Sequence, residues 1–361
     1  MSNPPAVPGV DPDELKMFSF QVWSYKQGEM VSTLIHLGDR LGFYTAMRGA
    51  GPMTSQQLAD ATDTHERFVR EWLLGQAAAR LITRHDDGTF ELTAVQAAVL
   101  ADEEGSIAFA CGAFRGGFSE TNYAALERSF RTGIGITYEE QGAAATAGLA
   151  RMTAPWARHG LESNILPAVD GLIDQLEAGI ALADIGCGSG VLACKLGELY
   201  PNTTITGYDP SPTAIANARQ RADEAGLDNV TFEVAFAQDL PTDPGFDAVF
   251  TFDVLHDMTR PDAAIAQVKE ALRPDGVWLV KDIKSSGDWS KDQKNPMLAM
   301  MYGFSVTSCL QSAMSEPDGM GLGTLGLHPT KAEEMMRAGG FARFTTHDVG
   351  DQSNFYYEIR H

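Results

Sequence analysis

Apolar positions recur along this chain with two different spacings, and the change of spacing divides it into two parts. Over residues 14–48 they recur every three or four residues, which is the period of an amphipathic helix. After about residue 178, short apolar runs such as IALADIG and FDAVFTF alternate with helical stretches. Strands that are buried on both faces read as continuous apolar runs, so the second part predicts a mainly parallel sheet covered by helices.

The first part begins with helical spacing over residues 14–48, where we expect breaks near Gly28 and Gly38. The end of the chain differs from both parts. The runs FARFTTHDV and NFYYEIRH are separated only by GDQS and therefore predict an antiparallel hairpin that closes the sheet. The chain accordingly divides into three predicted regions and one insertion: an N-terminal domain 1–104, a Gly/Ala-rich helical connector 105–175, a sheet domain 176–361, and the insertion 285–329 within it.

Residues 54–93 predict a winged helix. Thr54 or Ser55 can cap a short helix and Thr64 a second one. The stretch LITRHDDGTFELT then reads as a hairpin that turns at Asp87-Gly88. Such a module can serve packing and dimerisation, or it can bind DNA.

Charge argues against nucleic acid as a partner. The 361 residues contain 48 acidic and 27 basic side chains, a formal net charge of −21. Nucleic-acid binding depends on neutralising phosphates with Lys and Arg. In the expected recognition helix, Arg67 and Arg70 are offset by Glu66 and Glu71, so that helix lacks a basic face.

Composition also limits the location and the metal chemistry. No stretch approaches the ~18 apolar residues of a membrane span, and the N-terminus shows no secretory signal, so we expect a cytoplasmic protein that does not bind membranes. The cysteines form no CxxC pair, which argues against a disulfide framework and a zinc site, and we expect no metal. The four are Cys111, Cys187, Cys194 and Cys309.

Two stretches of the sheet domain carry candidate ligand chemistry. ADIGCGSG places Gly186, Gly188 and Gly190 at a strand-to-helix turn, where an open parallel sheet binds its ligand, with Asp184 just before them. The spacing differs from the G-x-G-x-x-G of a dinucleotide site, and no Lys-Ser or Lys-Thr follows as in a phosphate loop. In GYDPS, Asp209 closes the next strand, where a carboxylate can accept both hydroxyls of a ribose.

These residues resemble class I S-adenosylmethionine-dependent methyltransferases. The motifs LADIGCGSG, ITGYDPS, FAQDLP, FDAVFTFDVLHDM and ALRPDGVWLVKD follow the order and spacing of that family over residues 150–361. The resemblance implies an α/β fold with a Rossmann-like, mainly parallel seven-stranded sheet and S-adenosylmethionine as cofactor. Where many relatives carry an acidic residue for the adenine amino group, this chain has Phe236. The implied cofactor contacts are Asp184 and the glycine loop for methionine, Asp209 and Pro210 for the ribose, Ala237 and Gln238 for adenine, and Phe252 near the sulfonium.

The whole chain is also similar to two-domain small-molecule methyltransferases, whose mostly α N-terminal winged helix serves dimerisation. In the O-methyltransferases of this kind, an LHDW segment supplies a histidine general base, and here LHDM places that role on His256, with Asp257 beside it. A histidine whose pKa is near neutrality suits the removal of a proton from a nucleophile. His256 could equally line the pocket or have a purely structural role, and Asp253 fits a structural or cofactor-side carboxylate better than a base.

The acceptor side is expected to combine distant segments. Met301 and Tyr302 lie in the insertion 285–329, which could form a substrate lid or complete the core or a dimer interface. His328 is either a substrate-side polar residue or the cap of the last helix, and Tyr25 could roof the pocket or pack in the N-terminal core.

The function expected from the sequence is methyl transfer to an O, N or S atom of a small metabolite, by a homodimer. Two alternatives stay open at this point. One is a winged-helix transcriptional regulator that senses a nucleoside-like ligand, which the acidic composition disfavours. The other is a protein that binds S-adenosylmethionine without transferring a methyl group.

Overall fold

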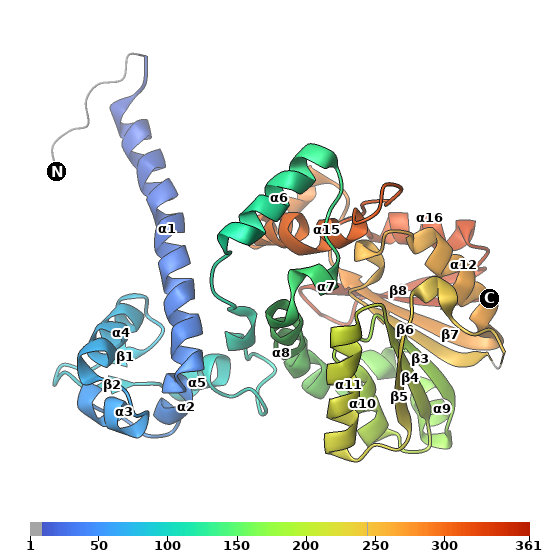
Figure 1. The fold of residues 1–361 in the computed structure, drawn as a ribbon, viewed down its shortest axis with the longest axis horizontal. Coiled ribbons are helices and arrows are strands. Elements are labelled where there is room, and N and C mark those ends of the chain that lie inside the picture. Colours follow the sequence, from blue (N-terminus) through green and yellow to red (C-terminus); the bar gives the residue numbers. More distant parts are fainter. Residues whose placement is uncertain (1–8, 244) are drawn as a thin grey trace. The chain divides into compact units, whose positions relative to one another are not determined.

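The computed structural model of the chain describes residues 9–243 and 245–361. The chain forms two compact units, Met1–Phe118 and Ser119–His361 (Figure 1). The predicted connector 105–175 therefore contributes to both units instead of standing between them. The predicted domain limits remain predictions.

The first unit is mostly helical. A long helix precedes a winged helix in which two helices are followed by a two-stranded antiparallel hairpin. Their core contains Tyr44, Leu58, Trp72 and Leu73, all buried. The elements are α1 (Pro12–Arg40), α2 (Phe43–Met47), α3 (Ser55–Ala61), α4 (Glu66–Ala78), β1 (Thr83–Arg84), β2 (Phe90–Glu91), α5 (Ala94–Leu100) and the 3-10 turn η1 (Cys111–Ala113).

The predicted breaks in the first helix are wrong. Helix α1 continues through Gly28 and Gly38, because one glycine lowers helix stability by only about 1 kcal/mol. A Cβ on Gly38 would lie 2.3 Å from the Trp72 ring, so glycine permits close packing there. The chain turns instead at Gly42, whose φ is +70°.

The caps of the winged helix are partly as predicted. Thr54 caps α3, and its side chain accepts a hydrogen bond from the Gln57 N–H. The cap of α4 is His65, one residue later than the predicted Thr64, because the His65 imidazole accepts a hydrogen bond from the Arg67 N–H at 3.2 Å. The hairpin forms where the sequence predicts it.

The second unit is built on a seven-stranded sheet in the order β5-β4-β3-β6-β7-β9-β8. The first five strands in this order are parallel, and β9 is antiparallel to both β7 and β8. The mainly parallel sheet and the closing hairpin are thus confirmed. The strands are β3 (Ala181–Ile185), β4 (Thr204–Asp209), β5 (Val230–Val234), β6 (Phe246–Phe252), β7 (Leu272–Ile283), β8 (Arg343–His347) and β9 (Asn354–Arg360).

Helices cover both faces of this sheet. On one face, α8 to α11 pack against a core that includes Phe250 and Leu279. On the other, α12 and α16 pack against a core that includes Trp278 and Tyr357. The helices are α8 (Ala143–His159), α9 (Leu172–Ala178), α10 (Val191–Leu199), α11 (Pro212–Ala225), α12 (Pro261–Ala271) and α16 (Pro329–Ala338).

Shorter elements surround the carboxyl ends of the strands. Helices α6 and α7 precede α8, and the insertion after β7 folds into three short α-helices and one π-helical turn. These elements are α6 (Glu120–Thr132), α7 (Tyr138–Gln141), η2 (Leu161–Ile165), η3 (Leu166–Ala168), η4 (Ala237–Asp239), η5 (Leu255–Asp257), α13 (Trp289–Asp292), α14 (Leu298–Phe304), η6 (Ser305–Cys309) and α15 (Leu310–Ala313).

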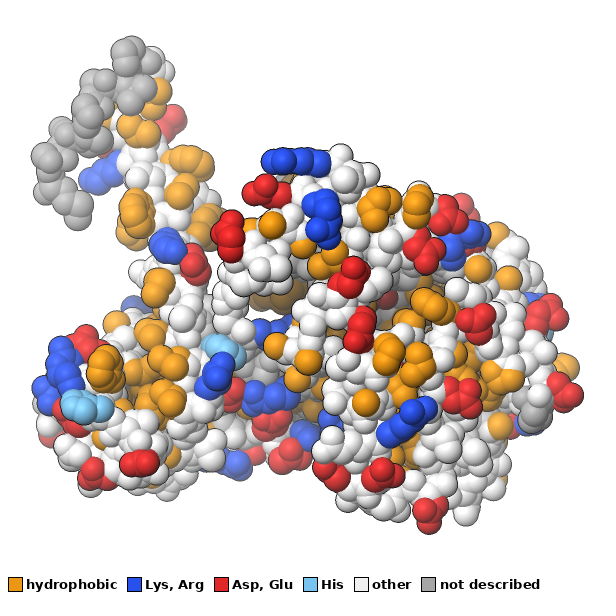
Figure 2. All heavy atoms as spheres, viewed as in Figure 1, with side chains coloured by type: hydrophobic (Ala, Val, Ile, Leu, Met, Phe, Trp, Pro, Cys, Tyr) orange, Lys and Arg blue, Asp and Glu red, His pale blue; other side chains and the backbone are white. Residues whose placement is uncertain are grey.

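Large apolar side chains are exposed along α1 (Figure 2). Among the described helices, none combines the length and apolar character that crossing a membrane requires. The exposed large apolar residues of α1 include Phe18, Phe20, Trp23 and Tyr25.

Candidate active site

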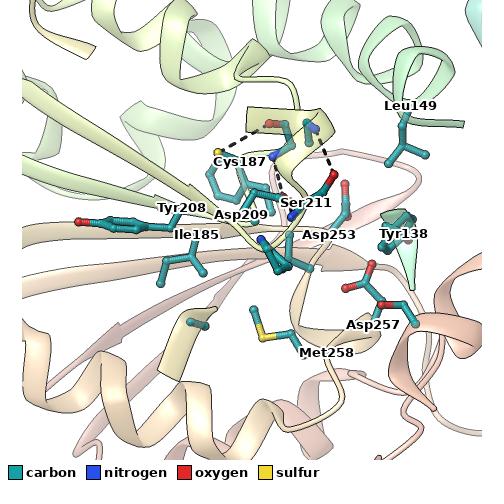
Figure 3. A pocket seen from close by; sticks show the side chains of 18 of the residues that line it. Tyr138, Leu149, Ile185, Cys187, Tyr208, Asp209, Ser211, Asp253, Asp257 and Met258 are labelled. Carbon is teal, nitrogen blue, oxygen red and sulfur yellow. Dashed lines mark hydrogen bonds between the residues drawn. The ribbon is translucent and has the colours of Figure 1, made fainter. Parts of the chain in front are cut away.

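A cavity of about 490 Å³ opens at the carboxyl ends of β3, β4 and β6, within the second unit (Figure 3). This is the edge at which open parallel sheets bind their ligands. Its walls come from the turns after these strands, from α7 and α8, and from the end of the insertion. The lining residues include Asp184, Gly186, Gly188, Asp209, Pro210, Ala237, Gln238, Phe252 and Asp257, all nine of which the sequence assigned to the site.

The glycine loop after β3 forms the floor of the cavity. Gly186, Gly188 and Gly190 have φ values of +70°, +52° and +71°, which disfavour residues with a Cβ. A Cβ on Gly186 would lie 2.5 Å from the Val254 side chain, so the loop after β6 packs directly on this turn. At Gly188 no atom lies within 4 Å of the Cβ position, so the loop presents bare backbone to open space. Gly190 lies against Phe232 and does not line the cavity.

Two carboxylates lie at this floor. Asp209 accepts hydrogen bonds from the Gly188 N–H at 3.0 Å and the Ser211 N–H at 2.9 Å. Asp184 is buried, and its Oδ2 has no hydrogen-bond partner among the described residues. Burial, and after it the charge of Asp209, raises the pKa of Asp184 to about 8. A buried acceptor without a partner indicates a site for a hydrogen-bond donor.

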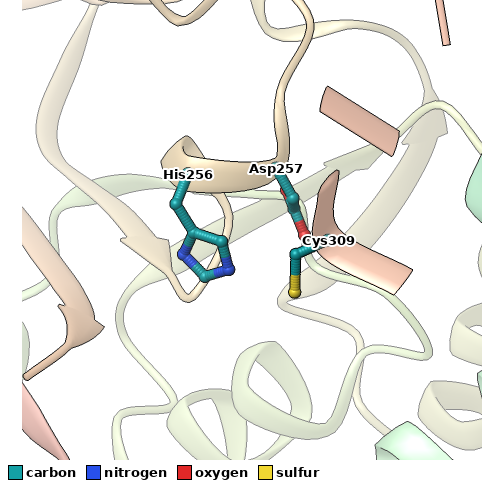
Figure 4. A group of neighbouring side chains, drawn as sticks. All are labelled: His256, Asp257 and Cys309. Atoms are coloured by element: carbon teal, nitrogen blue, oxygen red, sulfur yellow. The ribbon is translucent and has the colours of Figure 1, made fainter. Parts of the chain in front are cut away.

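The histidine at the other end of the cavity does not face it. His256 is 2% exposed, and its Nδ1 lies 2.8 Å from Asp282 Oδ1 at the end of β7. Asp257, the next residue, lines the cavity instead. The ligating atoms of His256, Asp257 and Cys309 lie within 4.8 Å of one another (Figure 4). The prediction that the chain holds no metal stays a prediction, since nitrogen, oxygen and sulfur are gathered here.

Burial and neighbouring charges shift the pKa values of His256 and Asp257. Burial alone would lower the pKa of His256, but the Asp282 carboxylate raises it, and the result lies well above the ordinary histidine value. The ring is also buried, does not line the cavity, and its Nδ1 is already bound to Asp282. Burial raises the pKa of Asp257 to about 7, although the neighbouring His256 charge opposes that shift. Asp257 therefore lines the cavity at the end near His256 and has a pKa close to neutrality.

The wall around Asp257 joins segments that are distant in the sequence. The Tyr138 hydroxyl on α7 lies 3.8 Å from Cys309 Sγ in the insertion, and Ser308 donates to the Gln141 side chain at 2.8 Å. The insertion also holds the loop that carries the histidine, because the Gly323 N–H donates to the His256 carbonyl at 3.0 Å. Burial raises the pKa of Tyr138, which keeps its hydroxyl protonated.

Four residues expected on the acceptor side do not line the cavity. Met301 and Tyr302 lie on α14, outside the lining set, and the end of α15 contributes Ser312 and Ser315 in their place. His328 caps α16, where its Nδ1 accepts a hydrogen bond from the Lys331 N–H at 3.4 Å. Tyr25 belongs to the first unit, in which it is exposed, so its roofing role stays a prediction.

Sequence reasoning missed several residues that the fold brings to the site. Asp282 and Lys281 lie at the end of β7, in the motif LVKDI, whose two charged residues after an apolar run were the only available signal. Tyr138 and Glu139 lie in a glycine-rich stretch that reads as a connector. Glu139 accepts hydrogen bonds from Ser211 and from the Thr213 hydroxyl, the latter at 2.6 Å, and so ties α7 to the turn after Asp209.

Comparison with known protein families agrees with this geometry. Residues 176–340 match the model of a methyltransferase domain, and residues 29–102 match the Rv2258c-like winged helix-turn-helix domain. The chain thus carries a region that matches a methyltransferase domain behind a region that matches a winged-helix domain. The glycine loop and Asp209 lie in the region that matches the methyltransferase domain, as do the lining residues from Asp184 to Glu316, whereas the lining residues from Thr137 to Ala157 precede it.

Individual relatives resemble the chain to different extents. The demethylspheroidene O-methyltransferase of Cereibacter sphaeroides is 28% identical over 73% of this chain and 70% of its own length. The 27-O-demethylrifamycin SV methyltransferase of Amycolatopsis mediterranei is 38% identical, but over only 28% of this chain and 38% of its own length. This chain covers only 30% to 47% of the length of several further curated relatives. The human N-acetylserotonin methyltransferase structure has a TM-score of 0.68 at 19% identity, covering 98% of this chain and 99% of its own, which shows a shared fold.

Proposed function

We propose that the protein transfers a methyl group from S-adenosylmethionine to an oxygen atom of a small molecule. The observation that carries the proposal is the continuous cavity of the methyltransferase domain, which has the glycine loop and Asp209 at one end and Asp257 at the other. Oxygen is favoured over nitrogen and sulfur because the relatives named above that match the chain include a demethylspheroidene O-methyltransferase. The small size of the cavity, about 490 Å³, fits a small acceptor.

The residues at the floor fit the cofactor. Asp209 can accept hydrogen bonds from the ribose hydroxyls, and the unpartnered Asp184 Oδ2 can accept one from the ammonium group of the methionine. Open space at Gly188 lets the backbone approach the cofactor. Ala237, Gln238 and Phe252 line the cavity. In this proposal the first two would contact adenine and Phe252 would lie near the sulfonium. When bound, the cofactor supplies an electrophilic methyl carbon on a positively charged sulfur.

The protein's own contribution is to hold the acceptor in line and to take its proton. A bond forms between the acceptor oxygen and the methyl carbon while the carbon–sulfur bond breaks, and the hydroxyl proton passes to the Asp257 carboxylate. His256 acts through Asp257. Its imidazolium, paired with Asp282, stabilises the ionised form of Asp257. The role proposed for His256 is thus to position and tune the base, where the sequence suggested the base itself.

Two measurements test the function. Incubation of the protein with S-adenosylmethionine and a panel of small hydroxylated compounds should produce S-adenosylhomocysteine, detected by mass spectrometry. Calorimetry should show that S-adenosylhomocysteine binds to the purified protein. Absence of binding would overturn the proposal. Binding with no turnover of any acceptor would instead favour a protein that holds the cofactor without transferring the methyl group.

The regulator alternative is not favoured. In the recognition helix α4, Arg67 pairs with Glu71 at 2.6 Å and Arg70 with Glu66 at 2.7 Å, so both cations are neutralised within the helix. A helix that reads DNA needs a basic face toward the phosphates. DNA binding at physiological salt that disappears in an Arg67→Ala/Arg70→Ala variant would reverse this preference.

We also propose that the protein is a cytoplasmic homodimer and that α1 serves dimerisation. Phe18, Phe20, Trp23 and Tyr25 are each at least 65% exposed on this helix. A large exposed apolar surface on a monomer is typical of an association interface. Light scattering should give twice the mass of 38.9 kDa. Replacing Phe20 and Trp23 by Ser should yield the monomer.

A further inference from the structure

A buried charge pair in the cavity has no role in the function proposed so far. Lys281, at the end of β7, is 6% exposed and lines the cavity beside Asp253, the first residue after β6. Its Nζ pairs with Asp253 Oδ2 and lies 4.5 Å from the centroid of the Trp156 ring. Removing a lysine from water is costly unless its charge is compensated, so a buried lysine in a cavity wall needs an explanation.

The surroundings hold this pair rigidly. The Asn354 amide donates to Asp253 Oδ1 at 2.8 Å, and the Trp156 indole N–H donates to the Tyr356 hydroxyl at 3.0 Å. Asp253 itself has φ of +58°, an unfavourable value for a residue with a side chain. Strained backbone of this kind persists where the neighbours over-determine it, and it is concentrated at binding sites.

The pair lies beside the glycine loop, away from the adenosine end. Val254, the residue after Asp253, packs on Gly186, where an added Cβ would lie 2.5 Å from its methyl groups. In the strand pairing, Lys281 faces Phe252, the residue assigned to the sulfonium side of the cofactor. A cofactor with its ribose at Asp209 therefore directs its amino-acid end toward this pair.

Charge complementarity identifies the group that the pair would bind. Six acidic residues line the cavity, against two cations among the described residues, Lys281 and Arg260. The Arg260 guanidinium is half-exposed and already bound to Asp262 and Asp318. Lys281 is therefore the buried cation that the described lining offers to a carboxylate. The amino-acid end of S-adenosylmethionine carries one carboxylate, which matches Lys281, and one ammonium group, which is assigned above to the unpartnered Asp184 Oδ2.

We propose that Lys281, held by Asp253 and Trp156, binds the carboxylate of the cofactor's amino-acid end and so discriminates S-adenosylmethionine and S-adenosylhomocysteine from adenosine compounds that lack it. This inference rests on the function proposed above and adds a recognition site to it. The residues involved come from β7, the turn after β6 and α8, outside the glycine loop that the sequence assigned to the methionine end.

The test compares three ligands by calorimetry: S-adenosylhomocysteine, its decarboxylated analogue S-adenosyl-3-thiopropylamine, and 5′-methylthioadenosine. In the unaltered protein, loss of the carboxylate should weaken binding about tenfold or more, the scale of a hydrogen bond between charged groups. In Lys281→Met, S-adenosylhomocysteine should lose that advantage, so that it and the decarboxylated analogue differ by less than about threefold. Binding of 5′-methylthioadenosine, which reports only the adenosine end, should stay within about threefold.

Lys284→Met is the matched control. Lys284 follows the same strand, pairs with Asp348 at 3.1 Å and lies 4.6 Å from the Phe355 ring centroid, but it does not line the cavity. Its replacement should leave all three affinities unchanged. Lys281→Arg, which keeps the positive charge, should retain part of the preference for the carboxylate.

Several results would overturn the proposal. One is equal binding of S-adenosylhomocysteine and its decarboxylated analogue to the unaltered protein, a measurement that needs no variant. A second is an unchanged preference of Lys281→Met for the ligand that carries the carboxylate. A third is an equal loss of affinity for all three ligands, which would mark Lys281 as purely structural. If Lys281→Met does not fold, Asp253→Asn/Lys281→Met removes both charges and leaves no unpaired carboxylate. No binding of S-adenosylhomocysteine to the unaltered protein would contradict the proposed function itself.

Discussion

The two ends of the cavity are built in different ways. At the cofactor end, Asp209 and Gly188 are joined by a hydrogen bond between residues 21 apart in the sequence, and both lie in turns that directly follow strands. At the acceptor end, the contacts between Tyr138 and Cys309 and between Gln141 and Ser308 join residues 171 and 167 apart. Local turns thus form the first end and long-range packing forms the second. The predictions below probe this contrast, from the largest expected effect to the smallest.

Asp257→Asn should have the largest effect at the acceptor end. We expect turnover to fall by about 10²–10⁴, the usual contribution of a general base, while S-adenosylhomocysteine binding stays nearly unchanged. Because the ionised carboxylate is the active form and its pKa is about 7, kcat/KM of the unaltered enzyme should fall as the pH drops through 7. Asp275→Asn, at an exposed position, is the control. Full activity in Asp257→Asn together with loss of activity in His256→Ala would return the base to His256.

Asp282→Asn should substantially lower the free energy of unfolding. Removing one partner of a buried charge pair usually costs about 3–5 kcal/mol of unfolding free energy. Since His256 has a raised pKa when folded, the pair stabilises the protein fully below the unfolded value of about 6.5, and this contribution is lost as the pH rises through the folded pKa. The deficit of the variant, measured by urea unfolding, should therefore be larger at pH 6 than at high pH.

The surface variant Asp348→Asn, which breaks an exposed pair with Lys284, should change stability little at any pH. A deficit in Asp282→Asn that does not depend on pH would show that Asp282 acts through packing and not through the charge of His256.

Asp209→Ala should lower the affinity for S-adenosylhomocysteine by an intermediate amount. Loss of hydrogen bonds between a carboxylate and the ribose should reduce S-adenosylhomocysteine affinity by about 1–3 kcal/mol. Calorimetry measures this directly, with Asp223→Ala on the exposed part of α11 as the control. An unchanged affinity would place the ribose elsewhere in the cavity.

Glu139→Gln should have the smallest effect. Its carboxylate joins α7 to Ser211 and Thr213, so its loss should free that segment to open more often. We expect S-adenosylhomocysteine to dissociate about two to five times faster, as in other enzymes where a closing segment controls ligand release. Stopped-flow displacement measures the rate, and Glu127→Gln, in an exposed pair with Arg131, is the control. A slower or unchanged rate would mean that α7 does not cover the cofactor.

Much of the fold could be predicted because the signals were local. Thr54 marks the start of a helix through its own side chain, and the run IALADIG followed by glycines marks a buried strand that ends in a turn. The errors arose where packing outweighed propensity. Helix α1 passes Gly38 because Trp72 packs against the missing side chain, and His65 displaced Thr64 as a cap within the same turn.

The candidate site shows the same division. The cavity is lined by the residues that the sequence assigned to the cofactor, apart from Gly190, since each lies in or beside a turn at the carboxyl end of a strand. On the acceptor side the sequence assigned catalysis to the segment LHDM, which stays a prediction, but could not indicate which of its two titratable residues faces the cavity. The two residues are neighbours in the turn η5, so the conformation of this turn decides which of them faces the cavity. That conformation depends on Asp282 of β7 and on the insertion.

The sequence by itself therefore determined the winged helix and the order of strands and helices, because strand periodicity and glycine turns are properties of consecutive residues. Its assignment of the glycine loop and Asp209 to the cofactor stays a prediction. Only the tertiary structure decided that Asp257 faces the cavity while His256 is buried against Asp282, and that Lys281 meets Asp253 beside the glycine loop. These pairings join residues from different strands. Their charges are tolerated in the interior only because the folded chain brings each one to its partner.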